Sequence, residues 1–221
     1  MKFEQNHAGE SGLRLSGLYA ILDFATGTSA EESQLITLAR ELLAGGGRWF
    51  QLRAKQVSAE KVLHLARHLR PLCEAAGAKF IINDRMDIAL ASGAHGVHLG
   101  QTDLPPEAAR KIAPPGFLVG LSTHTPEQVR GAAQRSVDYI GFGPIFPTQS
   151  KADAQSAKGV ALLREVRCLT ELPIVAIGGI EIAHASEILA AGANAVAMIG
   201  ALQRAETPQS VPRELRQNPK N

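Results

Sequence analysis

The sequence predicts an α/β protein that forms a single-domain (β/α)8 TIM barrel, and three observations support this prediction. Short apolar runs alternate with helical segments eight times along the chain. Polar clusters follow the carboxyl ends of the apolar runs, as expected for the catalytic face of a barrel. The composition, with 21 glycines and 5% aromatic residues, favours a tightly wound α/β fold over a sandwich. An open doubly wound sheet is the alternative, but no G-x-G-x-x-G follows the first run.

Length, charge and cysteine content restrict the class of protein further. The 221 residues suffice for one large domain, and a net charge of +2 gives no argument for a nucleic-acid or membrane partner. No apolar run approaches the roughly 20 residues of a membrane-spanning helix. Cys73 and Cys168 match no metal or redox spacing, so we expect two buried thiols in a cytoplasmic protein. The barrel is expected over 17–206, between flexible tails over 1–16 and 207–221.

The elements can be justified in chain order. A first strand over 18–22 precedes Ser29 and Glu32, which have the spacing of a capping box at the start of a helix. Thr125 and Gln128 repeat that spacing at a later helix, with a proline in its first turn. The other strands are expected over 48–52, 80–82, 96–99, 117–121, 137–141, 173–177 and 195–199. The eight strands and their helices complete the expected barrel.

Two acidic residues stand just past the ends of neighbouring strands. Asp84 follows the run over 80–82, and Asp103 follows the run over 96–99. Parallel neighbouring strands bring such carboxylates to one edge of the sheet, where they repel each other unless a cation lies between them. Mg²⁺ suits such a site, because it binds one or two carboxylates and completes its shell with water and phosphate. The alternative is that both are ordinary loop acids.

Gln51, Arg53 and Lys55 alternate along the second strand and its extension. If the strand geometry persists, a period of two places them on one face. Buried amide, guanidinium and ammonium groups are costly without an anionic partner, so we interpret them as a site for a metal-bound diphosphate or polyphosphate. The alternative is an internal salt-bridge network in which Arg53 or Lys55 pairs with Asp84.

Further polar or glycine-rich segments fall at the same ends of later strands. Gly178 and Gly179 follow the seventh strand and Gly200 the eighth, where barrels often bind phosphate through backbone N–H groups. A tight turn that needs a positive φ would explain the paired glycines equally well. The long connection over 143–159 contains Thr148, Ser150 and Lys151 and is expected to be functional or mobile.

Three other polar residues could each have a chemical or a structural role. His124 is a candidate acid or base, but a histidine just before a helix is more often structural. His98 lies inside an apolar strand, which indicates a core residue with satisfied hydrogen bonds. Asn83 either contacts a polar ring or phosphate or caps the following helix. No Ser-His-Asp or Cys-His arrangement indicates a protein nucleophile.

Taken together, these residues resemble the thiamine-phosphate synthase family over roughly residues 17–204. Each motif is modest by itself, and their order along the chain makes the resemblance specific. The motifs are Tyr19-Ala20-Ile21-Leu22-Asp23, Gln51-Leu52-Arg53-Ala54-Lys55, Ile82-Asn83-Asp84-Arg85, His98-Leu99-Gly100-Gln101-Thr102-Asp103, Gly120-Leu121-Ser122-Thr123-His124-Thr125, Gly141-Phe142-Gly143-Pro144-Ile145-Phe146-Pro147-Thr148 and Ala176-Ile177-Gly178-Gly179-Ile180.

The resemblance implies a transferase that joins a pyrimidine diphosphate to a thiazole phosphate and releases pyrophosphate. It implies that Asp84 and Asp103 hold Mg²⁺. Residues expected to contact the pyrimidine diphosphate are Gln51, Arg53, Lys55, Asn83, Ser122 and Lys151, of which Arg53, Lys55, Ser122 and Lys151 are the expected catalytic residues. Residues expected to border the thiazole phosphate are Thr148, Ser150, Gly178, Gly179, Ile199 and Gly200.

The chain departs from the family pattern at a few positions, and other functions stay open. Gly200 stands where the family often has serine, so a hydroxyl donor to phosphate is missing. A thiazole tautomerase with the same barrel would use His124 as a proton shuttle and would need no metal. A non-catalytic phosphate-binding module is the third hypothesis. The sequence also leaves open whether the protein forms a homo-oligomer.

Overall fold

The computed structural model describes residues 14–148 and 156–216. Eight parallel strands form a closed barrel in which each strand pairs with its neighbours in sequence, and β8 closes on β1. The strands are β1 (Gly17–Asp23), β2 (Trp49–Arg53), β3 (Lys79–Asn83), β4 (Gly96–Leu99), β5 (Leu118–Thr123), β6 (Tyr139–Phe142), β7 (Ile174–Ile177) and β8 (Ala195–Met198). The predicted (β/α)8 barrel is therefore confirmed, with strand ends that differ by a few residues from those expected.

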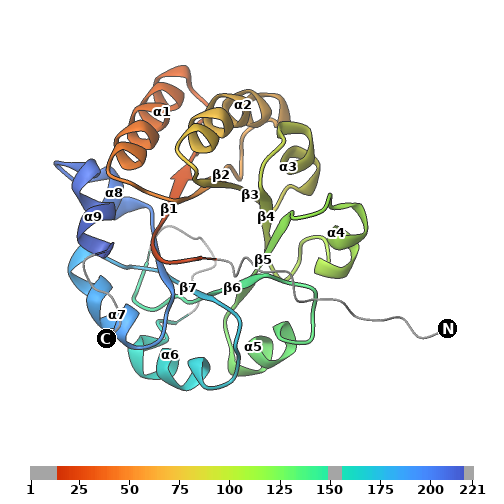
Figure 1. The fold of residues 1–221 in the computed structure, drawn as a ribbon, viewed down its shortest axis with the longest axis vertical. Helices are drawn as coiled ribbons and strands as arrows, with labels where there is room; N and C mark the ends of the chain where they lie inside the picture. Colours follow the sequence, from red (N-terminus) through yellow and green to blue (C-terminus); the bar gives the residue numbers. More distant parts are fainter. Residues whose placement is uncertain (1–13, 149–155, 217–221) are drawn as a thin grey trace.

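Helices surround the barrel and cover its outer face (Figure 1). They are α1 (Ser29–Ala44), α2 (Ala59–Ala75), α3 (Met86–Ser92), α4 (Pro106–Ile112), α5 (Pro126–Ala132), α6 (Gly159–Arg167), α7 (Ala185–Ala190), α8 (Gly200–Gln203) and α9 (Val211–Arg216), with short 3-10 turns η1 (Ile182–His184) and η2 (Pro208–Ser210). No helix among the described residues is long and apolar enough to cross a membrane. Each strand is therefore covered by helices on its outer face, and its inner face contributes side chains to the interior of the barrel.

Strand alternation divides the apolar residues into two cores. Leu18, Ala20 and Leu22 of β1 point outward into the layer between strands and helices, whereas Tyr19 and Ile21 point into the barrel. The interior is filled by apolar and aromatic side chains, of which those of Leu15 and Trp49 lie at the amino-terminal end of the strands. The interior side chains include Leu15, Tyr19, Trp49, Ile81, Tyr139 and Val175. Any substrate site must therefore lie at the opposite, carboxyl end.

The first helix begins one residue away from the expected capping box. Thr28, not Ser29, is the N-cap residue, and its hydroxyl accepts a hydrogen bond from the N–H of Glu31. The Glu31 carboxylate accepts from three N–H groups of the preceding loop, those of Ala25, Thr26 and Gly27, which replaces the capping box expected at Ser29 and Glu32. At α5 the expected capping threonine is confirmed, because the Thr125 hydroxyl accepts from the N–H of Gln128. The Gln128 side chain accepts from the N–H of His124, one residue before the N-cap residue, so the pair is not a reciprocal capping box.

The expectation of two buried thiols is wrong for one cysteine. Cys73 lies on the face of α2 that packs on the sheet and is buried, and burial raises its pKa to about 12. Cys168, the C-cap residue of α6, is exposed because the buried face of this helix consists of Val160, Leu163 and Val166. Both cysteines are free thiols.

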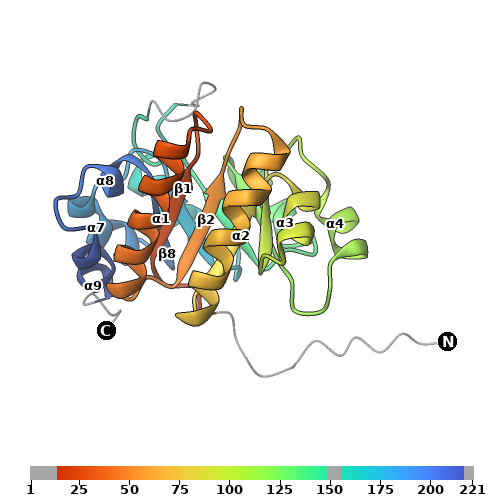
Figure 2. The ribbon, with the colours of Figure 1, turned by 90° about the horizontal axis from the view of Figure 1, so that it is seen from above.

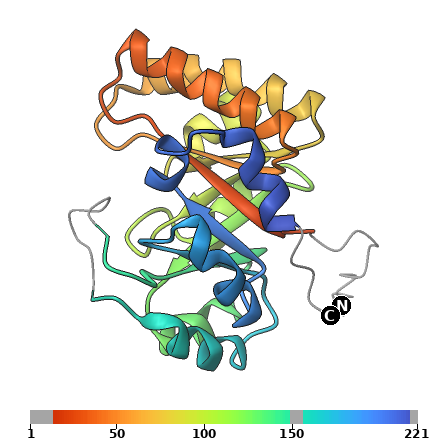
Figure 3. The same cartoon turned by 90° about the vertical axis from the view of Figure 1, so that its left-hand side faces the viewer.

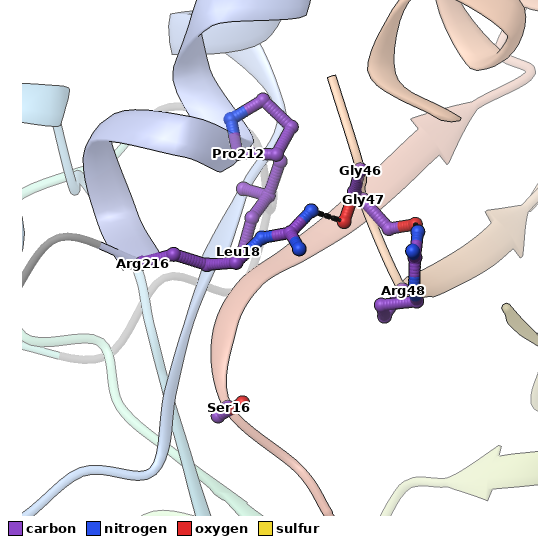
Figure 4. Close-up of a pocket in the computed structure, with 7 residues that line it drawn as sticks. All are labelled: Ser16, Leu18, Gly46, Gly47, Arg48, Pro212 and Arg216. Atoms are coloured by element: carbon purple, nitrogen blue, oxygen red, sulfur yellow. Dashed lines mark hydrogen bonds between the residues drawn. The ribbon is translucent and has the colours of Figure 1, made fainter. Parts of the chain in front are cut away.

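The expected C-terminal tail over 207–221 is folded as far as Arg216. Helix α9 lies beside β1 in Figure 3, with Val211 and Leu215 buried. Figure 4 shows Arg216 reaching from α9 to the carbonyl oxygen of Gly46 at the turn before β2. The polar composition of the segment concealed this short helix, whose buried residues are Val211, Pro212 and Leu215. The expected N-terminal tail lies mostly outside the described residues, but Leu15 within it is buried.

We expect Leu215→Ala to lower the free energy of unfolding by about 2–5 kcal/mol, because it removes a buried side chain and leaves a cavity under α9. Chemical denaturation followed by circular dichroism measures this loss. Arg213→Ala is the matched control, since Arg213 is exposed on the same helix. Equal stability of the two variants would contradict the packing of α9 on the barrel.

Candidate active site

Asp84 and Asp103 lie at the carboxyl end of the barrel, after the adjacent strands β3 and β4. Asp84 has φ 61°, a rare conformation for a residue with a side chain, and its N–H donates to the carbonyl oxygen of His98 at 2.8 Å. The Asp103 carboxylate accepts a 2.6 Å hydrogen bond from the N–H of Gly100, which holds it over the end of β4. The structure therefore brings the two acids to one edge.

The electrostatics of this edge favour a cation. Burial is the largest cause of the raised pKa of the Asp84 carboxyl; the Lys55 ammonium opposes it, and the neighbouring Asp103 carboxylate adds to it. Lys55 forms an ion pair with Asp84. Two close carboxylates, one of them poorly solvated, provide the oxygen ligands that Mg²⁺ prefers.

Arg53 has a partner that the sequence analysis did not predict. Its guanidinium forms a 2.6 Å ion pair with Asp23, because β1 and β2 pair in the register that sets these two residues side by side. Lys55 pairs with Asp84, as the salt-bridge alternative predicted. Both side chains of the Arg53–Asp23 pair are largely buried, at 14% and 18% exposed. The guanidinium is thus held in place at the end of β2.

A chain of hydrogen bonds crosses the barrel interior from β2 to β5. The Gln51 amide donates to the hydroxyl of Tyr19 at 3.1 Å, and the Tyr19 and Tyr139 hydroxyls are 2.8 Å apart. The Tyr139 hydroxyl lies 3.2 Å from Nδ1 of His98, whose Nε2 lies 3.0 Å from the hydroxyl of Ser122. This confirms that His98 is a core residue with satisfied hydrogen bonds, and it connects two of the predicted substrate contacts, Gln51 and Ser122.

Glycines make room for this chain. A Cβ on Gly120 would lie 2.4 Å from Nδ1 of His98 and 2.3 Å from the Tyr139 ring. A Cβ on Gly141 would lie 3.2 Å from the His98 ring. Gly141 pairs with Ser122 between β5 and β6, and Gly120 lies two residues before Ser122 on β5. The motif glycines of these strands therefore serve the packing of His98 and Tyr139.

The glycines after β7 have a steric role. Gly178 and Gly179 have φ 102° and 62°, as the tight-turn alternative predicted. A Cβ on Gly178 would lie 2.4 Å from Pro144, and one on Gly179 would lie 2.4 Å from the carbonyl oxygen of Pro147. The loop after β6 therefore lies directly against the loop after β7. This contact brings the half-buried Thr148 toward the expected phosphate site.

An arginine that the sequence analysis did not single out lies at the end of β8. Ile199 and Gly200 form the start of α8, and Nη1 of Arg204 would be only 2.7 Å from a Cβ on Gly200. The guanidinium also pairs with Glu181 in the loop after β7. Glycine at position 200 thus leaves the space that the Arg204 side chain occupies. The signal available in the sequence was the four-residue spacing between Gly200 and Arg204, which makes two positions neighbours on a helix surface.

The remaining predicted residues are placed as follows. Asn83 ends β3 and is half-buried, and its carbonyl oxygen accepts from the N–H of Arg85. Nδ1 of His124 donates to the carbonyl oxygen of Gly143 at 2.7 Å, which fixes the ring at the end of β5. Ser150 and Lys151 lie outside the described residues.

Comparison with known proteins reveals relatives that cover most of the chain. Residues 18–202 match the family described as thiamine monophosphate synthase. The thiamine-phosphate synthase of Methanocella arvoryzae is 48% identical over 179 residues, 81% of this chain and 84% of the relative. That of Koribacter versatilis is 45% identical over 193 residues, 87% of this chain and 91% of the relative. The solved thiamine phosphate pyrophosphorylase of Pyrococcus furiosus is 33% identical, with a TM-score of 0.80 over 93% of this chain and 95% of that one.

We expect Asp103→Asn to lower the pKa of Asp84, because a neutral amide no longer raises it, and Lys55→Ala to raise that pKa, because the cation that opposes the shift is lost. The measurement is a carboxyl-detected NMR titration of Asp84 in metal-free protein. The two variants have opposite expected signs and serve as each other's control. A pKa that moves in neither variant would contradict the proximity of the three groups.

Proposed function

The chain belongs to the thiamine monophosphate synthase family, and from this premise we propose that it is a transferase of thiamine biosynthesis. It couples 4-amino-2-methyl-5-(diphosphooxymethyl)pyrimidine with 4-methyl-5-(2-phosphooxyethyl)thiazole, and it releases thiamine phosphate and pyrophosphate. The observation that carries the proposal is the pair Asp84 and Asp103, set at one edge beside Lys55 and Arg53. We also propose that the protein is active in the cytoplasm, because both of its cysteines are free thiols and the cytoplasm keeps thiols reduced.

Mg²⁺ fits the donor set of this edge. Asp84 and Asp103 would hold it, since both supply carboxylate oxygens at the ends of adjacent strands. When bound, the ion would neutralise negative charge on the diphosphate group. Lys55 pairs with Asp84 in the structure, so it lies where it would contact a diphosphate that the metal holds.

The residues around this edge would perform the coupling by positioning and charge stabilisation. The C–O bond between the pyrimidine methylene and the diphosphate breaks, and its electron pair leaves with pyrophosphate. The thiazole nitrogen supplies the pair for the new C–N bond, while the electron-rich aminopyrimidine supports positive charge at the methylene. Arg53, Lys55 and Lys151 would stabilise the charge on the departing group. No proton is transferred, so the step needs no base and no protein nucleophile.

The interior hydrogen-bond chain would orient Ser122 toward the substrate. If each group donates onward, from Gln51 through Tyr19 and Tyr139 to His98, then Nε2–H of His98 donates to the Ser122 oxygen. The Ser122 O–H then points away from His98, toward the carboxyl end where the diphosphate would lie. Burial raises the pKa of both tyrosines, so their hydroxyls stay protonated.

The thiazole phosphate would lie at the ends of β7 and β8. Thr148, Gly178, Gly179, Ile199 and Gly200 border this region, with Ser150 expected from the sequence. Arg204 would supply a cation here, because its guanidinium lies over Gly200. This cation would take the place of the hydroxyl that a serine at position 200 would provide.

The assay that tests the proposal is release of pyrophosphate with both substrates, with and without Mg²⁺. We expect wild-type protein to require both substrates and the metal. Asp84→Asn and Asp103→Asn should each lose activity, because each removes one of few anionic ligands. Asp87→Asn is the control, because Asp87 is an exposed acid on the same segment that pairs with Arg85. A carboxylate whose variant keeps wild-type turnover and metal dependence is not a ligand, and wild-type protein without coupling activity would refute the function.

The tautomerase hypothesis predicts a different pair of effects. His124 is the residue that favours this hypothesis. It lies at the end of β5, where its Nδ1–H donates to the carbonyl oxygen of Gly143 and Nε2 therefore carries the lone pair of the neutral ring. We expect Lys55→Ala to slow coupling by roughly 10- to 150-fold, since a hydrogen bond to a charged group contributes about 1.5–3 kcal/mol. His124→Ala should do less, because no proton moves. Both variants should be measured side by side in a coupling assay and in a thiazole isomerisation assay. If the protein has only one detectable activity, and His124→Ala abolishes it while Lys55→Ala does not, the protein is the tautomerase.

A further inference from the structure

Three side chains that the coupling reaction does not use meet on the outer surface, between α1 and α2. Glu32 comes from the first turn of α1, and His64 and His68 lie one turn apart on α2. The two helices lie side by side over β1 and β2 (Figure 2). Candidate ligand atoms, one from each of the three residues, all lie within 4.8 Å of one another. This is the one such group of three or more His, Cys, Asp or Glu residues in the described part of the chain.

The distances within this group suit a shared metal ion better than a direct hydrogen bond. Oε1 of Glu32 lies 3.4 Å from Nε2 of His64, longer than the usual 2.7–3.2 Å of an N–H···O hydrogen bond. Ligands about 2.0–2.1 Å from a tetrahedral Zn²⁺ are themselves roughly 3.3 Å apart. The Glu32 oxygen also lies 3.9 Å from Nδ1 of His68, and the two imidazole rings are 4.5 Å apart. A rotation of the His68 side chain that turns its other nitrogen, Nε2, toward Glu32 would bring all three residues onto one ion.

The surroundings of His68 favour metal binding as well. Its Nδ1 lies 3.0 Å from the carbonyl oxygen of His64, and a carbonyl oxygen can only accept, so Nδ1 carries the proton in this contact. The lone pair is then on Nε2. Metal-binding histidines commonly use the second ring nitrogen in this way, as a donor to a carbonyl group that fixes the tautomer.

We propose that Glu32, His64 and His68 form a zinc site that links α1 to α2. Two imidazoles and one carboxylate are the ligand set of three-residue zinc sites, which keep a fourth position for water. The exposure of the two imidazoles leaves this position open to solvent. The site is distinct from the Asp84–Asp103 edge in position and in chemistry, because oxygen-only ligands favour Mg²⁺ and imidazole favours Zn²⁺. Its occupation would hold together the helices that cover β1 and β2.

Zinc binding to the tag-free full-length chain tests the proposal. Isothermal titration near neutral pH, with millimolar Mg²⁺ present to occupy carboxylate-only sites, should show one Zn²⁺ bound per chain. Zinc at about 100 times its Kd should raise the Tm by about 5–10 °C, because it binds only the folded state. Co²⁺ bound in its place should give the visible absorption of a low-coordinate site with nitrogen ligands.

Variants separate the site from adventitious binding. His64→Ala and His68→Ala should each weaken zinc binding at least 10-fold and abolish the Tm shift, and Glu32→Gln should weaken it measurably. Glu60→Gln is the matched control, an exposed carboxylate on the same helix outside the group. All four positions are on the surface, and the Tm without zinc verifies that the variants fold. Wild-type protein without a zinc-dependent Tm shift, or binding that survives both histidine substitutions, would overturn the proposal.

Discussion

Closure of the barrel is the constraint on which the rest of the structure depends. β1 pairs with both β2 and β8, so all eight parallel strands end at one rim. Residues far apart in the sequence meet there only because of this closure. The same pairing fixes individual contacts, since the register of β1 on β2 sets Asp23 beside Arg53. Loss of closure would therefore scatter the site as well as expose the interior.

The barrel interior combines an apolar lower part with a polar upper part. Leu15 and Trp49 fill the amino-terminal end, whereas the interior closer to the carboxyl end contains hydroxyls and an imidazole that are costly to bury without partners. The chain through Tyr139 and His98 satisfies them. Large rings need space, and the glycines of β5 and β6 provide it. The hydrogen bonds that satisfy these buried polar groups thus also orient Ser122 at the rim.

The rim itself is electrostatically unfavourable in the absence of a cation. Asp84 has a left-handed backbone, a largely desolvated carboxyl and another carboxylate beside it. Each of these features costs stability, and Lys55 offsets only part of that cost. Sites that bind a metal and a diphosphate commonly have this character, because a group that repels its neighbours when alone binds a counter-ion strongly. The proposed binding of a metal and a diphosphate would give this cost a functional reason.

The sequence by itself determined the barrel, because alternation of strand and helix is a local pattern that parallel pairing can satisfy in few ways. It also placed Asp84, Asp103 and Ser122 at one end, since the sequence alone shows which residues directly follow a strand. Only the tertiary structure decided the partners. Arg53 with Asp23, Arg204 over Gly200 and the helix that contains Leu215 depend on register, free space and packing between distant segments. Such contacts produce no periodic pattern in the sequence, because they depend on which distant segments the closed barrel brings together.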